Sequence, residues 1–265
     1  MIRPFLAPAR RALAALGVGA LLAAGLAGCG SGGDRVSEPA PTTRPPRSSS
    51  TTTTQATVPP LAPGMRLVAE AVVPQVAVFD EPGAPKPSRT LANPTPTPAP
   101  LVFLVEERRP DGWLEVDLPI RPNGSTGWIR AETVSLAQTG YRVVVELGAH
   151  RLTLYDRDRI VVQAPVGVGV SETPTPGGVY YIKELLRPPD PGGPYGPYAY
   201  GLSGFSNVLT SFAGGDGVIG IHGTDDPSSI GRDVSHGCIR IGNDVITRLV
   251  ETIGLPLGTP VEIRA

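Results

Sequence analysis

The chain has 265 residues and a formal net charge of −1 at pH 7, with 31 prolines and 33 glycines. This length holds one large or two modest domains, and the Pro and Gly content predicts extensive turns and linkers. The near-zero net charge gives no indication of a nucleic-acid partner. Because charged residues make up 18% and aromatic residues 5%, we expect the folded part to consist mainly of aliphatic and β-branched side chains.

The N-terminus has the pattern of an export signal. Arginines at positions 3, 10 and 11 precede an apolar segment over 12–26, which is too short for a stable membrane-spanning helix. The segment ends in Leu26-Ala27-Gly28-Cys29, which resembles the bacterial lipobox, whose cysteine is lipidated and becomes the first mature residue. We therefore expect residues 1–29 to be a lipoprotein signal peptide. Cys29 would then anchor the exported protein to the outer face of the bacterial cell membrane, facing the cell wall; the alternative is an ordinary signal peptide with a chance cysteine.

Residues 30–64 consist largely of Ser, Thr, Pro and Gly with scattered charge. Such a composition cannot bury enough apolar surface to fold, so it predicts a disordered linker. A linker of this kind would act as a tether between the membrane and the folded part.

A small all-β unit is predicted over residues 65–137, because short β-branched and aromatic runs alternate with Gly, Pro and Asn. The proline-rich segment 81–100 is expected to be a long loop. The segments around Trp113 and Trp128 resemble the end of a bacterial SH3-like barrel, which implies a module that binds or positions peptidoglycan. The alternative is that both tryptophans fill a small core. The expected strands lie at 67–73, 76–79, 101–105, 113–118 and 127–130.

The C-terminal part is predicted to begin, after a connector at 137–140, with three strands in an antiparallel meander. His150 lies in the first turn and is expected to be solvated there. A segment rich in Pro, Gly and Tyr over 187–205 predicts a lid or binding loop, the alternative being a surface loop packed on itself. It contains Tyr195, Tyr198 and Tyr200. The expected strands lie at 141–147, 151–155, 160–168, 179–185, 218–221 and 259–263.

One short helix is predicted near the C-terminus. Asn243 and Asp244 are both good N-cap residues, and the helix is expected to run to Ile253, with Gly254 as its stop. Its apolar residues fall on one face, which we expect to pack beneath the loop that precedes the helix.

The candidate catalytic residues lie in two short runs, Ile221-His222-Gly223-Thr224 and Ser235-His236-Gly237-Cys238-Ile239-Arg240. These runs hold two of the three histidines and the only cysteine besides Cys29. A thiol beside an imidazole supplies a nucleophile and a base for covalent acyl transfer. A free thiol is only about 3% thiolate at pH 7, so it needs such a partner. If Cys29 carries lipid, Cys238 has no disulfide partner, which strengthens this interpretation.

Two other interpretations of the cysteine are open. Cys238 and His236 could be ordinary buried residues, although Gly237 favours a sharp, accessible turn. A zinc site from Cys238, His236 and His222 is the other alternative, but structural zinc sites take four ligands and no second thiol is present.

The same residues resemble the signature of the bacterial L,D-transpeptidases with a YkuD-type catalytic domain, and the resemblance covers residues 141–263. It implies that Cys238 is the nucleophile and His222 the general base, oriented by the Gly223 carbonyl. His236 would support the thiolate or the oxyanion, and the Gly237 and Cys238 amides would donate to the oxyanion. Ser235 would brace the loop. Arg240 would hold a substrate carboxylate or pair with Asp233 or Asp244.

The resemblance also implies a reaction. The thiolate would attack the carbonyl between residues three and four of a peptidoglycan tetrapeptide stem, release D-alanine, and pass the acyl group to the side-chain amine of a neighbouring stem in a 3→3 cross-link. Water as acceptor would make the protein an L,D-carboxypeptidase, and a protein amine would attach a lipoprotein to the wall. Another Cys/His peptidoglycan hydrolase and an inactive wall-binding lipoprotein are the alternatives from other classes.

The expected architecture is therefore mainly β: a small SH3-like β-barrel over 65–137, followed over 141–265 by a YkuD-type β-sandwich or barrel catalytic domain with one short helix. The expected partners are peptidoglycan stem peptides and the membrane, and no metal or other cofactor is implied. Inhibition by β-lactams of the carbapenem class is a further implication of the resemblance.

Overall fold

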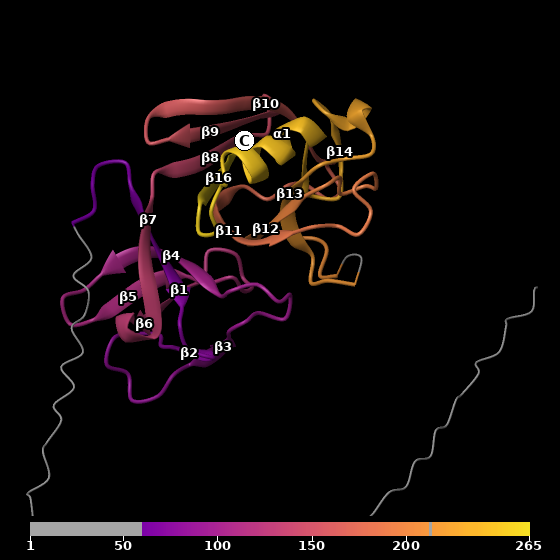
Figure 1. Cartoon of the computed structure of the whole chain (residues 1–265). Coiled ribbons are helices and arrows are strands. Elements are labelled where there is room, and N and C mark those ends of the chain that lie inside the picture. The colour runs from indigo at the N-terminus through magenta and orange to yellow at the C-terminus, as the bar shows by residue number, and fades with distance from the viewer. Residues whose placement is uncertain (1–59, 212–213) are drawn as a thin grey trace, which may run out of the picture. The chain divides into compact units, whose positions relative to one another are not determined.

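The computed structural model describes residues 60–211 and 214–265 (Figure 1). The predicted signal peptide, Cys29 and all but the last residues of the predicted linker lie outside this part. The described part is mainly β, as expected, and contains a single short α-helix. Within it, no helix has the length and apolar character needed to cross a lipid bilayer.

The N-terminal sheet has five strands in the order β6-β5-β4-β1-β7, all in antiparallel pairs. Phe103, Leu114 and Ile129 are fully buried beneath it. The neighbours of Phe103 on β4, Val102 and Leu104, are buried as well, in a separate cluster with Tyr181, so both faces of this strand are covered. The strands are β1 (Arg66–Ala71), β4 (Val102–Arg108), β5 (Trp113–Asp117), β6 (Thr126–Arg130) and β7 (Val134–Thr139).

Two elements of this unit differ from the sequence prediction. The predicted loop over 81–100 contains strand β3 (Arg89–Ala92), which pairs with β2 (Gln75–Val78) in a separate hairpin. The predicted connector at 137–140 is the end of β7, which pairs along the whole of β1 and leaves only Gly140 before the next strand. Both strands are weakly apolar, so tertiary pairing and not propensity determines them.

The tryptophans of this unit occupy different environments. Trp113 is 9% exposed and packs edge-on against Phe79, with ring centroids 5.1 Å apart. Trp128 is only half-buried, with the Arg109 guanidinium 5.6 Å from its ring centroid. The structure therefore places Trp113 inside the unit, whereas Trp128 keeps an accessible face.

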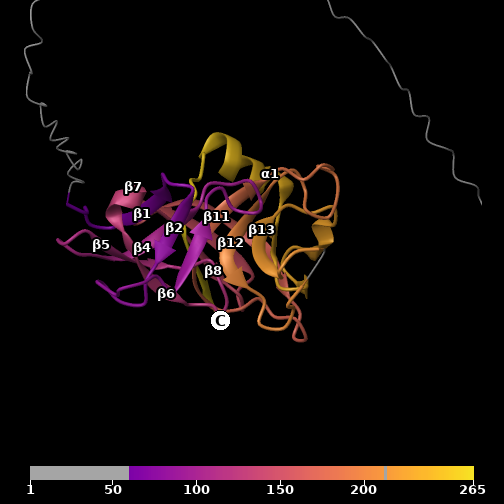
Figure 2. The same ribbon diagram turned by 90° about the horizontal axis from the view of Figure 1, so that it is seen from below.

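The C-terminal sheet has nine strands in the order β14-β10-β15-β13-β12-β11-β16-β8-β9, and an additional β9–β10 pairing closes it into a barrel. Closure satisfies the backbone groups that an open edge would leave unpaired. Strands β11, β12 and β13 run side by side (Figures 1 and 2). The strands are β8 (Tyr141–Glu146), β9 (Arg151–Asp156), β10 (Arg159–Gly169), β11 (Gly178–Leu186), β12 (Ala199–Phe205), β13 (Val218–His222), β14 (Asp233–Ser235), β15 (Ile239–Ile241) and β16 (Pro260–Arg264).

The predicted meander is confirmed, since β8 pairs with β9 and β9 with β10 in antiparallel register. The predicted loop over 187–205 is wrong in its second half, because Ala199–Phe205 is strand β12 and every residue in it is buried. A strand covered on both faces shows no alternation, and its glycines and tyrosines look like a loop in sequence. Tyr198 and Tyr200 are accordingly core residues, 6% and 1% exposed.

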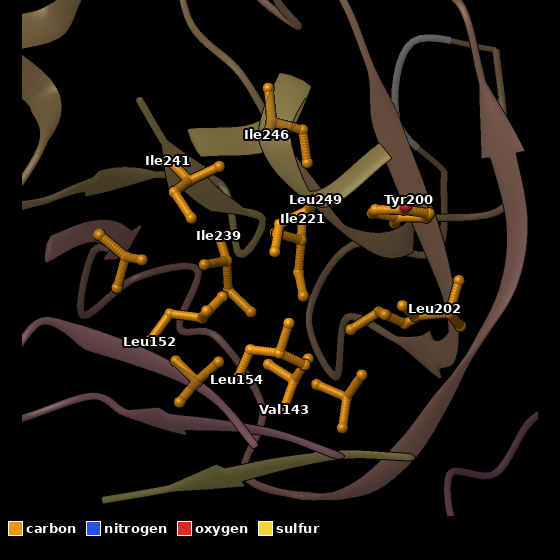
Figure 3. Packing of buried hydrophobic residues seen from close by; sticks show 14 of the residues in the cluster. Val143, Leu152, Leu154, Tyr200, Leu202, Ile221, Ile239, Ile241, Ile246 and Leu249 are labelled. Atoms are coloured by element: carbon orange, nitrogen blue, oxygen red, sulfur yellow. The ribbon is translucent and has the colours of Figure 1, made fainter. Parts of the chain in front are cut away.

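Apolar side chains from the barrel strands and the helix meet in one core (Figure 3). Ile239 and Ile241 on β15 are fully buried and lie on either side of Arg240. Each such side chain contributes about 1.5–3 kcal/mol relative to exposure. The turn that carries Cys238 is thus anchored on its C-terminal side by the core itself.

The predicted helix consists of α1 (Asn243–Thr247) followed directly by a π-helical turn, η3 (Arg248–Thr252). Ile253 N–H donates to the Arg248 carbonyl, five residues back, at 3.0 Å. Gly254, with φ +65°, ends the helix as predicted. The N-cap, however, is Gly242, which has no side chain to cap the helix. The Asn243 side-chain amide instead forms hydrogen bonds with the backbone of Thr224.

Candidate active site

His222 is the last residue of β13 and is 5% exposed. Its Nδ1 lies 2.6 Å from the Gly223 carbonyl oxygen. A carbonyl can only accept, so Nδ1 carries the hydrogen and Nε2 of the neutral ring is free to accept a proton. Burial lowers the pKa of His222 to about 4, partly opposed by the bond to Gly223, and the positive Arg240 lowers it further. The imidazole is therefore neutral at pH 7.

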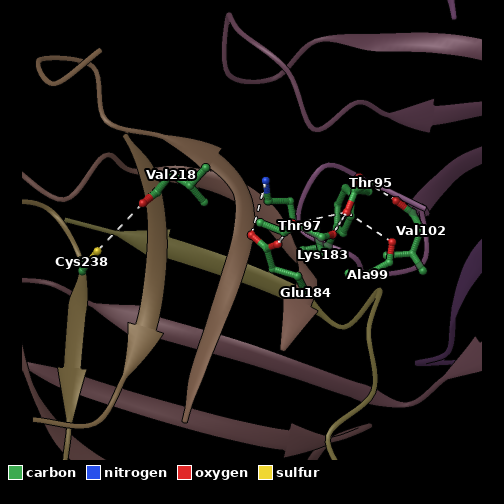
Figure 4. Close-up of polar contacts among 9 residues, drawn as sticks. Thr95, Thr97, Ala99, Val102, Lys183, Glu184, Val218 and Cys238 are labelled. Carbon is green, nitrogen blue, oxygen red and sulfur yellow. Dashed lines mark hydrogen bonds and ion pairs between the residues drawn. The ribbon is translucent and has the colours of Figure 1, made fainter. Parts of the chain in front are cut away.

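Cys238 lies in the tight connection between β14 and β15. Strands β13 and β15 are parallel, with Ile221 opposite Ile239 and His222 opposite Arg240. The thiol is partly exposed, and its Sγ lies 4.0 Å from the Val218 carbonyl oxygen (Figure 4). Burial raises the pKa of the Cys238 thiol, whereas a backbone hydrogen bond from Gly220 and the charge of Arg240 lower it. The resting site therefore holds a neutral thiol and a neutral imidazole.

The turn before Cys238 is held by Ser235, which is 2% exposed. Its hydroxyl donates to the Cys238 carbonyl at 2.6 Å and accepts from the Gly237 N–H at 3.1 Å. This is the bracing role expected for Ser235. It also engages the Gly237 N–H, which sequence reasoning had assigned to the oxyanion. Gly237 has φ +113°, a conformation that strongly favours glycine.

His236 and Arg240 flank this turn. His236 is exposed and lines the same pocket as Cys238. The Arg240 Nε is buried and finds no hydrogen-bond partner among the residues that the structure describes. The expected pairing of Arg240 with Asp233 or Asp244 is not found within the described residues. Asp233 instead binds His150, Nε2 to Oδ1 at 2.8 Å, and the His150 side chain stays partly exposed in its turn.

Two cavities meet at the thiol. The first, of about 300 Å³, is lined by Cys238, His222, His236 and Arg240, together with Ser206, Leu209 and Val218. The second, of about 470 Å³, shares His222 and Cys238 and extends to Thr97 and Glu184. Thr97 donates to the Glu184 carboxylate, whose Oε1 is 3.6 Å from Lys183 Nζ (Figure 4). Cys238 and His222 thus line both cavities.

Of the three tyrosines predicted for a lid, Tyr198 lines neither cavity, Tyr200 lines the second, and Tyr195 lines both. The Tyr195 ring packs at 60° to the His222 ring, with centroids 4.9 Å apart. Burial and the neighbouring Cys238 raise the pKa of its hydroxyl. Tyr198 and Tyr200 lie in the core, as described above.

Asn243 is a site residue whose role the sequence did not indicate. Its Oδ1 accepts from Thr224 N–H at 2.8 Å and its Nδ2 donates to the Thr224 carbonyl at 3.0 Å. A Cβ on Gly223 would lie 2.2 Å from that same Oδ1. Asn243 therefore fixes the backbone directly after His222, and only glycine fits at position 223.

The described residues contain no group of three or more His, Cys, Asp or Glu side chains arranged to hold a metal ion. In particular, Cys238, His236 and His222 do not form such a group. What the site offers is a thiol, a neutral base and a half-buried arginine, all lining one cavity.

Known proteins match the C-terminal part of the chain. Residues 140–263 match the family model described as the L,D-transpeptidase catalytic domain, YkuD. The YkuD proteins of Bacillus licheniformis and Bacillus subtilis strain 168, which are assigned to the L,D-transpeptidases, are 42% and 39% identical over 123 residues. Each match covers 46% of this chain and 65% of the Bacillus protein.

Among solved structures, an L,D-transpeptidase of Enterococcus faecium has 25% identity and a TM-score of 0.35, over 46% of this chain and 49% of that one. The family model and the Bacillus relatives match the same segment, which carries Cys238 and His222, so residues 140–263 of this chain are similar to a YkuD-type L,D-transpeptidase catalytic domain.

Proposed function

We propose that this protein is a peptidoglycan L,D-transpeptidase that forms 3→3 cross-links through a thioester on Cys238. One observation carries the proposal: Cys238 shares a cavity with a neutral histidine whose only basic nitrogen is unprotonated. The L,D-transpeptidase family, whose model residues 140–263 match, acts on peptidoglycan, which supports this substrate class.

The first half-reaction is acyl transfer to the enzyme. The Cys238 sulfur attacks the carbonyl between residues three and four of a tetrapeptide stem while His222 Nε2 takes the thiol proton. When the tetrahedral intermediate collapses, the imidazolium returns this proton to the departing amine of D-alanine. A thioester between Cys238 and residue three remains, and His222 is neutral again.

The second half-reaction transfers the acyl group. The side-chain amine of residue three on a neighbouring stem attacks the thioester and His222 accepts a proton from it. The new amide is the 3→3 cross-link, and the sulfur leaves as a thiol after taking that proton. Water in place of the amine would release a tripeptide, as in an L,D-carboxypeptidase, and a protein amine would give a wall-attached protein.

Arg240 is suited to the carboxylate of the leaving D-alanine. Its buried Nε has no partner within residues 60–211 and 214–265, and Arg240 lines the same cavity as Cys238. A buried donor without a partner is costly unless a ligand satisfies it. A carboxylate would provide a charge-assisted bond there, which supports the substrate role of Arg240.

The N-terminal part is proposed to place this activity at the cell wall. Lipidation of Cys29 would anchor the protein outside the membrane, the linker would span the gap, and the 65–137 unit would act as an SH3-like module on peptidoglycan. Membrane fractionation of Cys29→Ser tests the anchor. Release of the variant is expected, and retention equal to the wild type would contradict it.

A carbapenem is proposed to acylate Cys238 in the same way as a stem peptide, by ring opening onto the sulfur. The expected observation is a mass increase equal to the whole carbapenem on the wild type and none on Cys238→Ala. An adduct of equal amount on the alanine variant would exclude Cys238 as its site.

The decisive experiment incubates the protein lacking residues 1–29, beside Cys238→Ala, with a disaccharide tetrapeptide, and follows protein and product masses. A Cys238-dependent acyl-enzyme, D-alanine and a 3→3 dimer are expected. Tripeptide without dimer would indicate a carboxypeptidase. No adduct and no product from folded protein that still binds purified cell wall would favour the wall-binding lipoprotein.

A further inference from the structure

A loop of the N-terminal unit, residues 119–124 between β5 and β6, contacts the catalytic domain directly after β12. The Arg121 guanidinium donates to three carbonyl oxygens there: Nη1 to Ser206 at 2.7 Å, and Nη2 to Leu209 at 3.0 Å and to Asp216 at 2.9 Å. The three acceptors are distributed over both arms of the segment that joins β12 to β13. Arg121 therefore ties those two arms to each other.

Neighbouring contacts hold the guanidinium in place. It stacks over the Phe205 ring, with Cζ 4.8 Å from the centroid. Asn123 makes two bonds to the Phe205 backbone, accepting from its N–H at 2.9 Å and donating to its carbonyl at 2.7 Å. The planar Arg121 guanidinium is oriented by the aromatic ring on which it stacks. It therefore loses little conformational freedom on forming its three hydrogen bonds.

The segment that Arg121 holds forms a wall of the first cavity. Ser206, Leu209, Gly217 and Val218 line that cavity together with Cys238 and Arg240. Ser206 N–H donates to the Gly217 carbonyl at 2.8 Å, which closes the base of the segment. Gly217, at φ +71°, has room for no side chain, because a Cβ would lie 2.2 Å from the Leu209 carbonyl. Displacing the arms would thus change the shape of the cavity beside the thiol.

We propose that Arg121 is a positioning residue for the acyl donor, so that the N-terminal unit completes the donor side of the catalytic cavity. This inference rests on the proposed function, in which the cavity lined by Arg240 takes the D-alanine end of the donor stem. Arg121 does not touch the reacting atoms. It acts by holding Ser206, Leu209, Gly217 and Val218 as the cavity wall where the donor peptide binds.

The kinetic test uses Arg121→Ala and Arg121→Lys, with Arg130→Ala as the matched control. Arg130 belongs to the same unit and likewise stacks on an aromatic ring, 4.8 Å from the Trp113 centroid, but does not line the catalytic cavities. The donor tetrapeptide and the acceptor amine are varied separately. Loss of the guanidinium bonds should raise the donor KM about tenfold, with kcat and the acceptor KM within about twofold. Lysine should not rescue the donor KM, because a single ammonium cannot bridge both arms.

A second readout does not depend on turnover. Hydrogen exchange of the Ser206 amide, which donates to Gly217, should be about tenfold faster in both Arg121 variants and unchanged in Arg130→Ala. If the wild type does not turn over tetrapeptide but the Ser206 amide exchanges faster in the Arg121 variants, the proposed function fails while the Arg121 contact is upheld. A donor KM and a Ser206 exchange rate both equal to those of the wild type in folded Arg121→Ala would overturn the inference, as would equal effects in Arg130→Ala.

Discussion

His222 Nδ1 donates to the carbonyl of its own neighbour, Gly223, at 2.6 Å. The orienting group is thus a backbone carbonyl, where many catalytic triads have a carboxylate. A neutral acceptor fixes the tautomer but provides little stabilisation for an imidazolium. With burial added, the folded protein favours the neutral ring, which is the form that accepts a proton from Cys238.

The acidic limit of activity should consequently lie at low pH. The pKa of His222 is lowered to about 4, mainly by burial, and the ring acts as a base only when it is neutral. The rate of Cys238 acylation should therefore fall as the pH drops through about 4. Single-turnover acylation measured across pH checks this, and an acidic limb near the ordinary value of about 6.5 would contradict the buried neutral base.

The same titration should appear in the stability of the fold. Between the folded pKa of about 4 and the unfolded value of about 6.5 the unfolded chain binds the extra proton, so stability present above pH 6.5 is lost as the pH falls. The full shift corresponds to about 3 kcal/mol. In urea titrations, the loss of unfolding free energy between pH 7 and pH 4 should be larger in the wild type than in His222→Gln by about this amount. Equal pH dependence of the two proteins would mean that the pKa of His222 is the same in the folded and the unfolded chain.

The two motif histidines should differ strongly in function. His222 is buried beside Cys238, whereas His236 is exposed at the rim of the same cavity. Removing a general base costs about 10²–10⁴-fold in rate, so His222→Ala should lower the acylation rate within that range and His236→Ala should lower it less. Circular dichroism confirms folding of both variants. A larger loss in His236→Ala would exchange their roles.

The sequence predicted those parts of the fold in which local pattern and tertiary environment agree. The strands of the meander carry dense β-branched runs, and β13 was placed with His222 at its end. Strands β3 and β7 were missed because their side chains are weakly apolar, and β12 because both of its faces are buried. In each case pairing with distant segments supplies what the local pattern lacks.

The site shows the same division. Ser235 and Cys238 lie within one short motif, and the resemblance to the YkuD-type domains implies that His222, from an earlier run, acts on the same cysteine. The two hydrogen bonds between the Asn243 side chain and the Thr224 backbone could not be predicted, because Asn243 also fits the helix N-cap. The contact of Arg121 with Ser206 spans 85 positions, and no local signal in a single sequence indicates it.

Gly237 should be required for both backbone and catalytic reasons. At φ +113° an alanine is strained, and its Cβ would lie 3.2 Å from Ile219 Cδ1. Gly237→Ala should destabilise the fold by about 1–2 kcal/mol and also slow acylation, since the turn that presents Cys238 must shift. Gly231 provides the control: its φ is +82°, but a Cβ there would have nothing within 4 Å. Gly231→Ala should show a stability loss without slower acylation; parallel losses of rate in both variants would attribute the effect to backbone strain alone.

Asn243 should affect catalysis through the backbone after His222. Asn243→Ala removes both bonds to Thr224, and each is worth about 0.5–1.5 kcal/mol net. We expect about 1–3 kcal/mol of destabilisation and a lower kcat, because the Gly223 carbonyl is no longer held where it orients the imidazole. Asn243→Asp keeps the acceptor for Thr224 N–H but turns the donor into a carboxylate facing the Thr224 carbonyl, so it should not restore kcat. Asp244→Asn changes the next residue in the same helical turn and should leave kcat unaltered. A full kcat in folded Asn243→Ala would show that the Gly223 carbonyl is held by the barrel without this amide.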